Sequence, residues 1–210
     1  MEDVLYQYAL PDDPLRPQLC LDERPCFLIG DVGAILPMSP GKAKRYHYEY
    51  EKHGSCCVFL AFEPHTGFRY VEVRDRRTAV DYAQFMQNLL DKHYAHADCI
   101  RLVHDNLHTH TPGSFYEVLP PSEAFALSQR FEPHYTPKKG SWLNMAEMEF
   151  AALSQQCLDR RIPAFETLRQ EVLAWADKRN FDRKTVNWTF SQHDARNKLQ
   201  RHYQNVKKLI

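Results

Sequence analysis

Acidic residues stand where their side chains could hold divalent metal ions. Asp22 lies in the apolar alternation of Gln18 to Cys26, the pattern of a short strand that runs out at Asp22 and is closed by Pro25. Asp105 follows the apolar run Cys99 to His104, which is typical of a buried strand that opens into a polar loop. Two aspartates at neighbouring strand ends would suit Mg²⁺, which prefers carboxylate oxygens. Paired ions of this kind serve phosphodiester cleavage and strand joining.

A third acid is expected from the helix predicted over Leu143 to Asp159. Glu147 and Glu149 flank its apolar stripe on opposite edges, each roughly 70 to 90° away at about 100° per residue. Helical phase therefore leaves both glutamates open. Taken singly, an acid at a strand end or in the first turn of a helix is more often a cap or a solvated charge.

The elements that must position these acids alternate between strands and helices. The expected order is a strand at 18–26, a basic insertion at about 30–54, a hairpin of strands at 55–63 and 68–75, an amphipathic helix at 78–94, a strand at 99–104, a helix at 122–130, a strand at 131–136 and helices at 143–159 and after Pro163. This order predicts an α/β fold, a mixed sheet with helices on both faces of the ribonuclease H-like kind.

The chain has 210 residues, enough for one sizeable domain. We expect an irregular lead-in at 1–17, which carries Pro11, Pro14 and Pro17, then the catalytic domain at 18–177 and a basic C-terminal extension at 178–210. The six cysteines lack zinc-finger spacing, and no signal peptide or apolar run of about 18 residues occurs. Buried thiols and a cytoplasmic location without membrane contact are therefore expected.

Charge is balanced over the whole chain but not along it. Lys+Arg and Asp+Glu number 27 each, whereas residues 178–210 carry nine Lys/Arg against two acids, with aromatic residues among them. Such a tail suits nucleic acid, although a solvated surface helix has the same composition. The expected DNA contacts are Lys42, Lys44, Arg45, Lys138, Lys139, Lys178, Arg179, Arg183 and Lys184.

Three segments, LCLDE, LVHDNLHTH and GSWLNMAEMEF, occur in an order that resembles the mariner-like bacterial insertion-sequence transposases, whose catalytic domain is a ribonuclease H-like DDE endonuclease. The segments HGSCCVFLAFEPHTG, HYTPKKGSWLNMAE and VNWTFSQHDAR extend the likeness over roughly 18–196. The resemblance implies a metal-binding catalytic triad of Asp22, Asp105 and Glu147, the N-x-x-E match favouring Glu147 over Glu149. It also implies supporting roles for Asn106 and His110, although a loop Asn and His bonded only to backbone fit the pattern equally well.

Cofactors and partners follow from the same resemblance. It implies two Mg²⁺ or Mn²⁺ ions, DNA as partner in the form of transposon ends and target, and a homo-oligomer that brings two ends together. Members of the family carry helix-turn-helix domains that recognise the ends, and only about 20 residues precede Asp22, so this part is expected either in a separately encoded subunit or to have been lost. The expected setting is the bacterial cytoplasm, in association with the nucleoid.

Two other interpretations remain open on the sequence. His104, His108 and His110 could form a histidine site for zinc or iron, although three histidines of one loop seldom complete a site without distant ligands. The chain could also be a non-catalytic DNA-binding or regulatory remnant of a transposase. Retention of all three acids argues against such decay. Neither a Gly-rich phosphate loop nor a recognisable Ser or Cys nucleophile is present, which disfavours ATPases and hydrolases.

Overall fold

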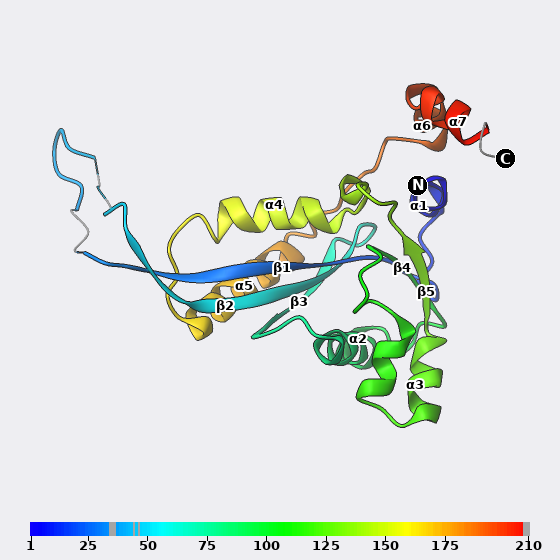
Figure 1. Ribbon diagram of the computed structural model, residues 1–210, viewed down its shortest axis with the longest axis horizontal. Helices are drawn as coiled ribbons and strands as arrows, with labels where there is room; N and C mark the ends of the chain where they lie inside the picture. Colours follow the sequence, from blue (N-terminus) through cyan, green and yellow to red (C-terminus); the bar gives the residue numbers. More distant parts are fainter. Residues whose placement is uncertain (34–36, 44, 46, 208–210) are drawn as a thin grey trace.

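The fold, obtained as a computed structural model, is a five-stranded mixed sheet with helices on both faces (Figure 1). The structure describes residues 1–33, 37–43, 45 and 47–207. The sheet order is β3-β2-β1-β4-β5, in which β1 runs antiparallel to β2 and parallel to β4. Its strands are β1 (Gln18–Asp31), β2 (Tyr50–Glu63), β3 (Phe68–Arg74), β4 (Ile100–His104) and β5 (Phe131–Tyr135). The predicted ribonuclease H-like architecture is confirmed.

Helices cover the two faces in separate layers. The α-helices are α1 (Glu2–Ala9), α2 (Ala79–His93), α3 (Pro121–Ser128), α4 (Ala146–Gln156), α5 (Phe165–Phe181), α6 (Gln192–Lys198) and α7 (Gln200–Lys207), with 3-10 turns at Pro112–Glu117 and Ser141–Leu143. Residues of α4 and α5 share one core cluster with the sheet, and residues of α2 and α3 share the other. Helix α2 begins at the predicted Thr78/Asp81 capping box.

Strand β1 is longer than expected, and Asp22 lies within it. The pairing with β4 stops at Cys20, whereas the pairing with β2 continues to Asp31. Beyond Cys20 the other edge of β1 is free of ladder bonds, so Pro25 can sit in the strand without losing a bond to β4. The strand end expected at Asp22 is thus the end of contact with β4.

The expected insertion at 30–54 begins with the last residues of β1, up to Asp31, and ends with the first residues of β2, from Tyr50. Strands β1 and β2 extend together as a hairpin arm, and the described residues 32–33, 37–43, 45 and 47–49 belong to its tip (Figure 1). The Arg161 guanidinium anchors the base of the tip, donating to Asp31 Oδ1 at 2.7 Å and to the carbonyl oxygens of His47 and Glu49, each at 2.9 Å. Lys42 and Arg45 are exposed on the arm, and Lys44 lies outside the described residues.

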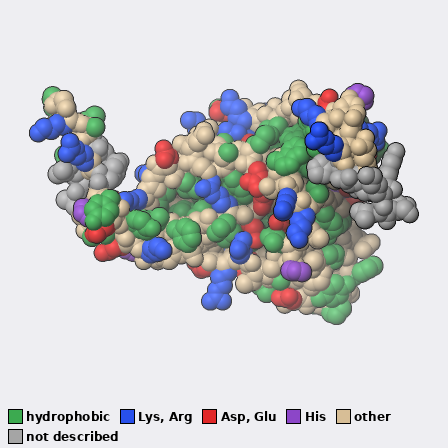
Figure 2. Space-filling model, turned by 45° about the horizontal axis from the view of Figure 1, so that its top comes forward, with side chains coloured by type: hydrophobic (Ala, Val, Ile, Leu, Met, Phe, Trp, Pro, Cys, Tyr) green, Lys and Arg blue, Asp and Glu red, His purple; other side chains and the backbone are tan. Residues whose placement is uncertain are grey.

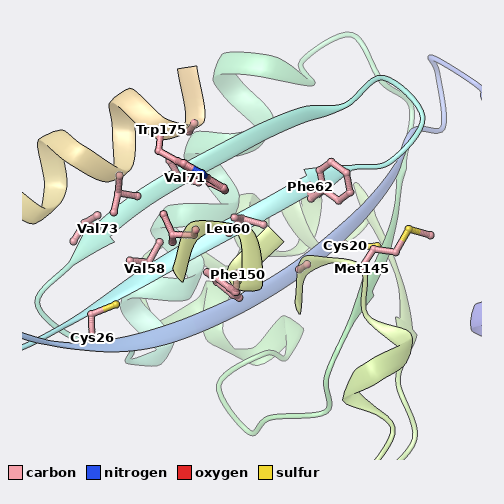
Figure 3. Packing of buried hydrophobic residues seen from close by; sticks show 14 of the residues in the cluster. Cys20, Cys26, Val58, Leu60, Phe62, Val71, Val73, Met145, Phe150 and Trp175 are labelled. Atoms are coloured by element: carbon pink, nitrogen blue, oxygen red, sulfur yellow. The ribbon is translucent and has the colours of Figure 1, made fainter. Parts of the chain in front are cut away.

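The core on the α4 face holds the site helix against the strands. Figure 3 shows Met145 beside Cys20 of β1, Phe150 over the strands in the middle of the view, and Trp175 of α5 beside Val71 of β3. Cys20, Cys26, Cys56 and Cys57 are buried free thiols, as predicted. Burial raises the pKa of the Cys20 thiol to about 11, which keeps it protonated.

The lead-in expected to be irregular begins with a helix. Val4, Leu5 and Tyr8 of α1 have helical spacing and are buried against the main core, which stabilises a helix too short to persist alone. The C-terminal extension returns to α1, where Arg196 of α6 pairs with Glu2 at 2.6 Å, so α6 lies near α1 (Figure 1). In the described residues, no helix combines the length and apolarity needed to cross a membrane.

Candidate active site

Asp22 and Asp105 are brought to one place by the register of two parallel strands. Cys20 of β1 is aligned with Val103 of β4, and both side chains lie in the core on the α4 face. Asp22 follows two residues after Cys20 within β1, and Asp105 comes directly after His104, the last residue of β4. The register thus brings the two predicted aspartates close enough for the charge of Asp105 to raise the pKa of Asp22.

Asn144 connects Asp22 to the start of α4. Its side-chain amide donates to Leu21 O at 2.8 Å and lies 3.5 Å from Asp22 Oδ2, while its Oδ1 accepts from the backbone N–H of Ala146 at 3.1 Å. The Asn144 carbonyl also accepts from the Glu147 backbone N–H at 3.1 Å. The buried Asn144 thus sets the first turn of α4 against β1, and this contact gives the N-x-x-E spacing a physical basis.

Glu147 and Asp22 both line an open cavity. Its volume is about 330 Å³, and its other walls include Pro25, Phe150 and Ser154. Burial, together with the nearby Glu147 and Asp105 carboxylates, raises the pKa of Asp22 to about 7, although the Glu23 backbone N–H donates to Asp22 Oδ1 at 2.7 Å and opposes this rise. Mutually repelling carboxylates are the environment that a divalent cation would stabilise.

Glu149, the other candidate in α4, has a different environment. Its side chain is buried and forms an ion pair with Arg69 of β3, whose side chain is 0% exposed. Arg179 of α5 donates a second pair of hydrogen bonds to the same carboxylate, at 2.8 and 3.0 Å. Burial alone would raise the pKa of Glu149, but the two guanidinium groups outweigh it and hold that pKa below its usual value. Glu149 therefore joins α4 to β3 and α5.

His110 supports Asp105 from the loop that follows β4. Its Nδ1 lies 2.7 Å from Asp105 Oδ1, its ring stacks on Tyr82, and its Nε2 is 3.7 Å from Glu23 Oε2. Burial lowers the pKa of His110, but Asp105 and Glu23 outweigh it and raise that pKa to about 9. Conversely, the His110 contact lowers the pKa of Asp105 against the effect of burial. A protonated imidazole thus fixes the orientation of the Asp105 carboxylate.

The three loop histidines do not gather into one site. His104, Asp105 and His110 each offer a ligand atom within 4.8 Å of the others, but His108 is exposed. Burial and the neighbouring His110 lower the pKa of His104 to about 4, so His104 is neutral. The pKa of His110, raised to about 9, makes it a poorer metal ligand at neutral pH, because a ligating nitrogen must give up its proton. The arrangement favours His110 as a partner of Asp105.

The remaining predicted residues are exposed, except for Arg179. Asn106 is exposed beside Asp105, and Lys138, Lys139, Lys178, Arg183 and Lys184 are exposed bases. Arg179 is a correction, because its guanidinium is held by Glu149 and its side chain is only 17% exposed, which removes it from the expected DNA contacts. Figure 2 shows acidic side chains grouped near the middle of one face, with basic side chains around them.

Sequence reasoning missed two residues of this network. Glu23 is 3% exposed beside His110. As the strand residue next to Asp22, it faces the opposite side of the sheet, and the loop that carries His110 reaches that side. The sequence motif around Glu147 contains Asn144 but does not reveal that this residue binds the first turn of α4. An Asn just before a helix is a recognisable capping signal that could have indicated this role.

Comparison with known proteins identifies the family of the chain. The family model described as DDE superfamily endonuclease matches residues 17–169, most of the chain. The chain therefore belongs to the DDE superfamily endonucleases, and its resemblance to mariner-like DDE transposases is confirmed. No curated protein sequence matches it.

Solved structures with a similar fold come from Mos1 mariner transposase. The crystal structure of the Mos1 catalytic domain has a TM-score of 0.54 at 14% identity, over 85% of this chain and 80% of that chain. The Mos1 mariner paired-end complex with Mn has a TM-score of 0.55 at 16% identity, over 85% of this chain and 54% of that chain. The Mos1 strand transfer complex gives 0.54 at 17% identity, over 83% and 50%. The chain thus spans about half the length of the transposase chains in these two complexes. At identities this low, the likeness shows a shared fold alone.

Proposed function

We propose that this chain is the catalytic domain of a mariner-like bacterial insertion-sequence transposase, which cuts DNA strands and joins them to target DNA with Asp22, Asp105 and Glu147 as metal ligands. The observation that carries the proposal is geometric: Asp22 and Glu147 line one open cavity, and Asn144, just before the helix that carries Glu147, places its amide 3.5 Å from Asp22 Oδ2. Burial and the Glu147 and Asp105 carboxylates also raise the pKa of Asp22 to about 7. A site that concentrates negative charge in this way is suited to cations.

The residues around the triad would prepare it for this chemistry. Asn144 would hold Glu147 near Asp22, and protonated His110 would orient Asp105 through the 2.7 Å contact. When bound, two Mg²⁺ or Mn²⁺ ions supply stabilisation of the attacking and leaving oxygens of an in-line displacement at phosphorus. No covalent enzyme intermediate is needed, because positioning and charge neutralisation lower the barrier.

DNA would approach across the face on which the acids open. The exposed bases Lys138, Lys139, Lys178, Arg183 and Lys184 would contact phosphates without reading sequence. Lys42 and Arg45 would grip DNA or a second copy of the chain from the arm. Two copies would bring two element ends together, and a separately encoded helix-turn-helix subunit would recognise those ends.

The test is a nicking and strand-transfer assay on DNA carrying the element ends. The helix-turn-helix subunit is added where a neighbouring reading frame encodes one. Wild-type protein should be active with Mg²⁺ or Mn²⁺ and inactive with EDTA, and Asp22→Asn and Asp105→Asn should be inactive. Asp91→Asn, which changes an exposed aspartate of α2, is the matched control and should keep activity. Activity in both Asp22→Asn and Asp105→Asn would refute the mechanism. DNA binding without any cutting by wild type would favour a non-catalytic remnant.

A further inference from the structure

An exposed aromatic surface lies beside the acid cluster. The Trp142 ring stacks on Trp188, with centroids 6.4 Å apart and an interplanar angle of 19°, and meets Phe190 edge-on at 5.7 Å. Trp142 is nevertheless 51% exposed. We call Trp142, Trp188 and Phe190 the aromatic platform. Figure 2 shows hydrophobic side chains beside the grouped acidic side chains on this face.

The aromatic platform is held in a fixed place. Trp142 sits in the 3-10 turn Ser141–Leu143, where the Tyr8 hydroxyl donates to Leu143 O at 2.6 Å. Below it, Trp188 packs on Tyr8 with centroids 5.2 Å apart and donates its indole N–H to Phe190 O at 2.8 Å. One face of the Trp142 ring is supported by these contacts while half of the residue remains open to solvent. A rigid, half-open indole is already organised to receive a flat ligand.

The aromatic platform is also close to the proposed reacting centre. Asn144 is two residues after Trp142, so their Cα atoms are at most about 7 Å apart. The Asn144 amide lies 3.5 Å from Asp22 Oδ2, and Glu147 follows one helical turn later. A ligand stacked on Trp142 would therefore lie next to a DNA strand held at the acids.

The charge around the aromatic platform indicates what that ligand is. Lys138 and Lys139 are exposed in the turn just before Trp142, and Lys198 places its Nζ 5.3 Å from the Phe190 ring centroid. An apolar protein partner gains little from a rim of lysines. Single-stranded nucleic acid uses both features, because its nucleobases stack on aromatic rings and its phosphates pair with cationic side chains such as lysine.

From these observations we infer that the exposed face of Trp142 stacks on an unpaired base of the DNA strand adjacent to the phosphate held at the acids. This inference rests on the proposed function, since it takes DNA as the substrate of the site. It adds that the substrate is locally unpaired there, and that Trp142 holds the displaced base while the lysines hold its phosphates.

A fluorescence titration of the full chain in EDTA tests this inference without depending on cleavage. The probe is a DNA duplex whose 3′ overhang of two nucleotides contains 2-aminopurine, compared with the same duplex made blunt. Stacking on an aromatic ring is expected to quench the 2-aminopurine signal. Trp142→Ala should weaken overhang binding by about 5- to 150-fold, the range for loss of one base–aromatic stack, and leave blunt-duplex binding within about twofold.

Two further variants separate stacking from folding. Trp142→Phe keeps an aromatic ring and should recover most of the quenching. Phe125→Ala removes an aromatic residue of α3 that is 58% exposed, and it should bind both probes as wild type does. Circular dichroism and thermal melting identify any variant that has lost its fold. If Trp142→Ala has done so, Trp142→Leu, which keeps the bulk without an aromatic ring, takes its place in each comparison.

The outcomes distinguish this inference from the proposed function. Equal binding of both probes by wild type and a folded Trp142→Ala would overturn the inference, even if metal-dependent cutting is lost in Asp22→Asn. Overhang binding that depends on Trp142 would uphold it, even if wild type fails to cut. Quenching that persists in Trp142→Ala would also overturn it, because another residue would then be the stacking partner.

Discussion

Two glutamates of α4, two residues apart, lie in opposite electrostatic environments. Glu147 is exposed and lines an open cavity with Asp22, where its charge helps to raise the pKa of Asp22. Glu149 is buried between Arg69 and Arg179, where two cations neutralise it. A buried acid held by two guanidinium groups joins elements of the fold, whereas the neighbouring Asp22 and Glu147 carboxylates at the cavity would suit a cation from outside the protein. The comparison assigns different tasks to neighbouring residues of the same type.

The largest expected effect is on stability at Glu149. Glu149→Ala should lower the free energy of unfolding by about 3 to 5 kcal/mol, because it leaves the buried Arg69 guanidinium without its carboxylate partner. Urea unfolding followed by circular dichroism measures the change. Glu147→Ala, from the exposed side of the same helix, should change it by less than about 0.5 kcal/mol. Equal losses in the two variants would remove the distinction between these glutamates.

The complementary effect is on catalysis at Glu147. Glu147→Gln should reduce the rate of DNA nicking by more than about 100-fold, beyond the loss usual for a residue that only supports a ligand. Its unfolding curve should match that of wild type. Glu123→Gln, an exposed glutamate of α3, is the control and should nick DNA normally. Normal nicking by Glu147→Gln would transfer the role to another acid.

A smaller effect is expected at His110. His110→Gln should reduce nicking by about 10- to 100-fold, since the residue orients Asp105 and is not itself a ligand. Exposed His108→Gln should have no effect.

The stability contributed by His110 should also depend on pH with a defined sign. The pKa of His110 is raised to about 9 from the usual 6.5, so the stabilisation is complete below pH 6.5 and is lost as pH rises through 9. The difference in unfolding free energy between wild type and His110→Gln should therefore be larger at pH 6 than at pH 9.5. A difference that grows with pH would show that His110 is not held as a cation.

The smallest effect concerns thermal stability at Asp22. Its folded-state pKa of about 7 exceeds the ordinary 3.8, so the folded state binds more protons, and stability should fall as pH rises from about 4 through 7. Asp22→Asn should flatten this slope. Mg²⁺ at ten times its dissociation constant should raise the wild-type Tm at pH 8 by about 3 to 6 °C and have little effect on Asp22→Asn. An identical Mg²⁺ response in both proteins would place the ion elsewhere.

The sequence predicted the fold well because most elements carry their own signals. The capping box of α2, the buried run of β4 and the hairpin of β2 and β3 are local patterns, and each was confirmed. The first helix was missed since it spans only eight residues and depends on burial of Val4 and Leu5 against distant segments. The extension of β1 past Pro25 was missed because the sequence does not show where β4 stops pairing.

The site was predictable only as far as its signals were local. Asp105 follows an unmistakable strand, but helical phase left Glu147 and Glu149 equivalent. What separates them is Arg69, 80 residues away, and Arg179, 30 residues away, and neither spacing has a recognisable sequence pattern. The same limit explains why Arg179 was assigned to DNA and why Glu23 was overlooked.

The most direct test of the triad is anomalous diffraction from crystals of the chain grown with DNA and Mn²⁺. The proposal predicts peaks about 2.1 Å from carboxylate oxygens of Asp22, Asp105 and Glu147, and none at Glu149. A manganese ion bound instead by His104 and His110, or peaks that avoid Glu147, would contradict the assignment of these three acids as the metal ligands.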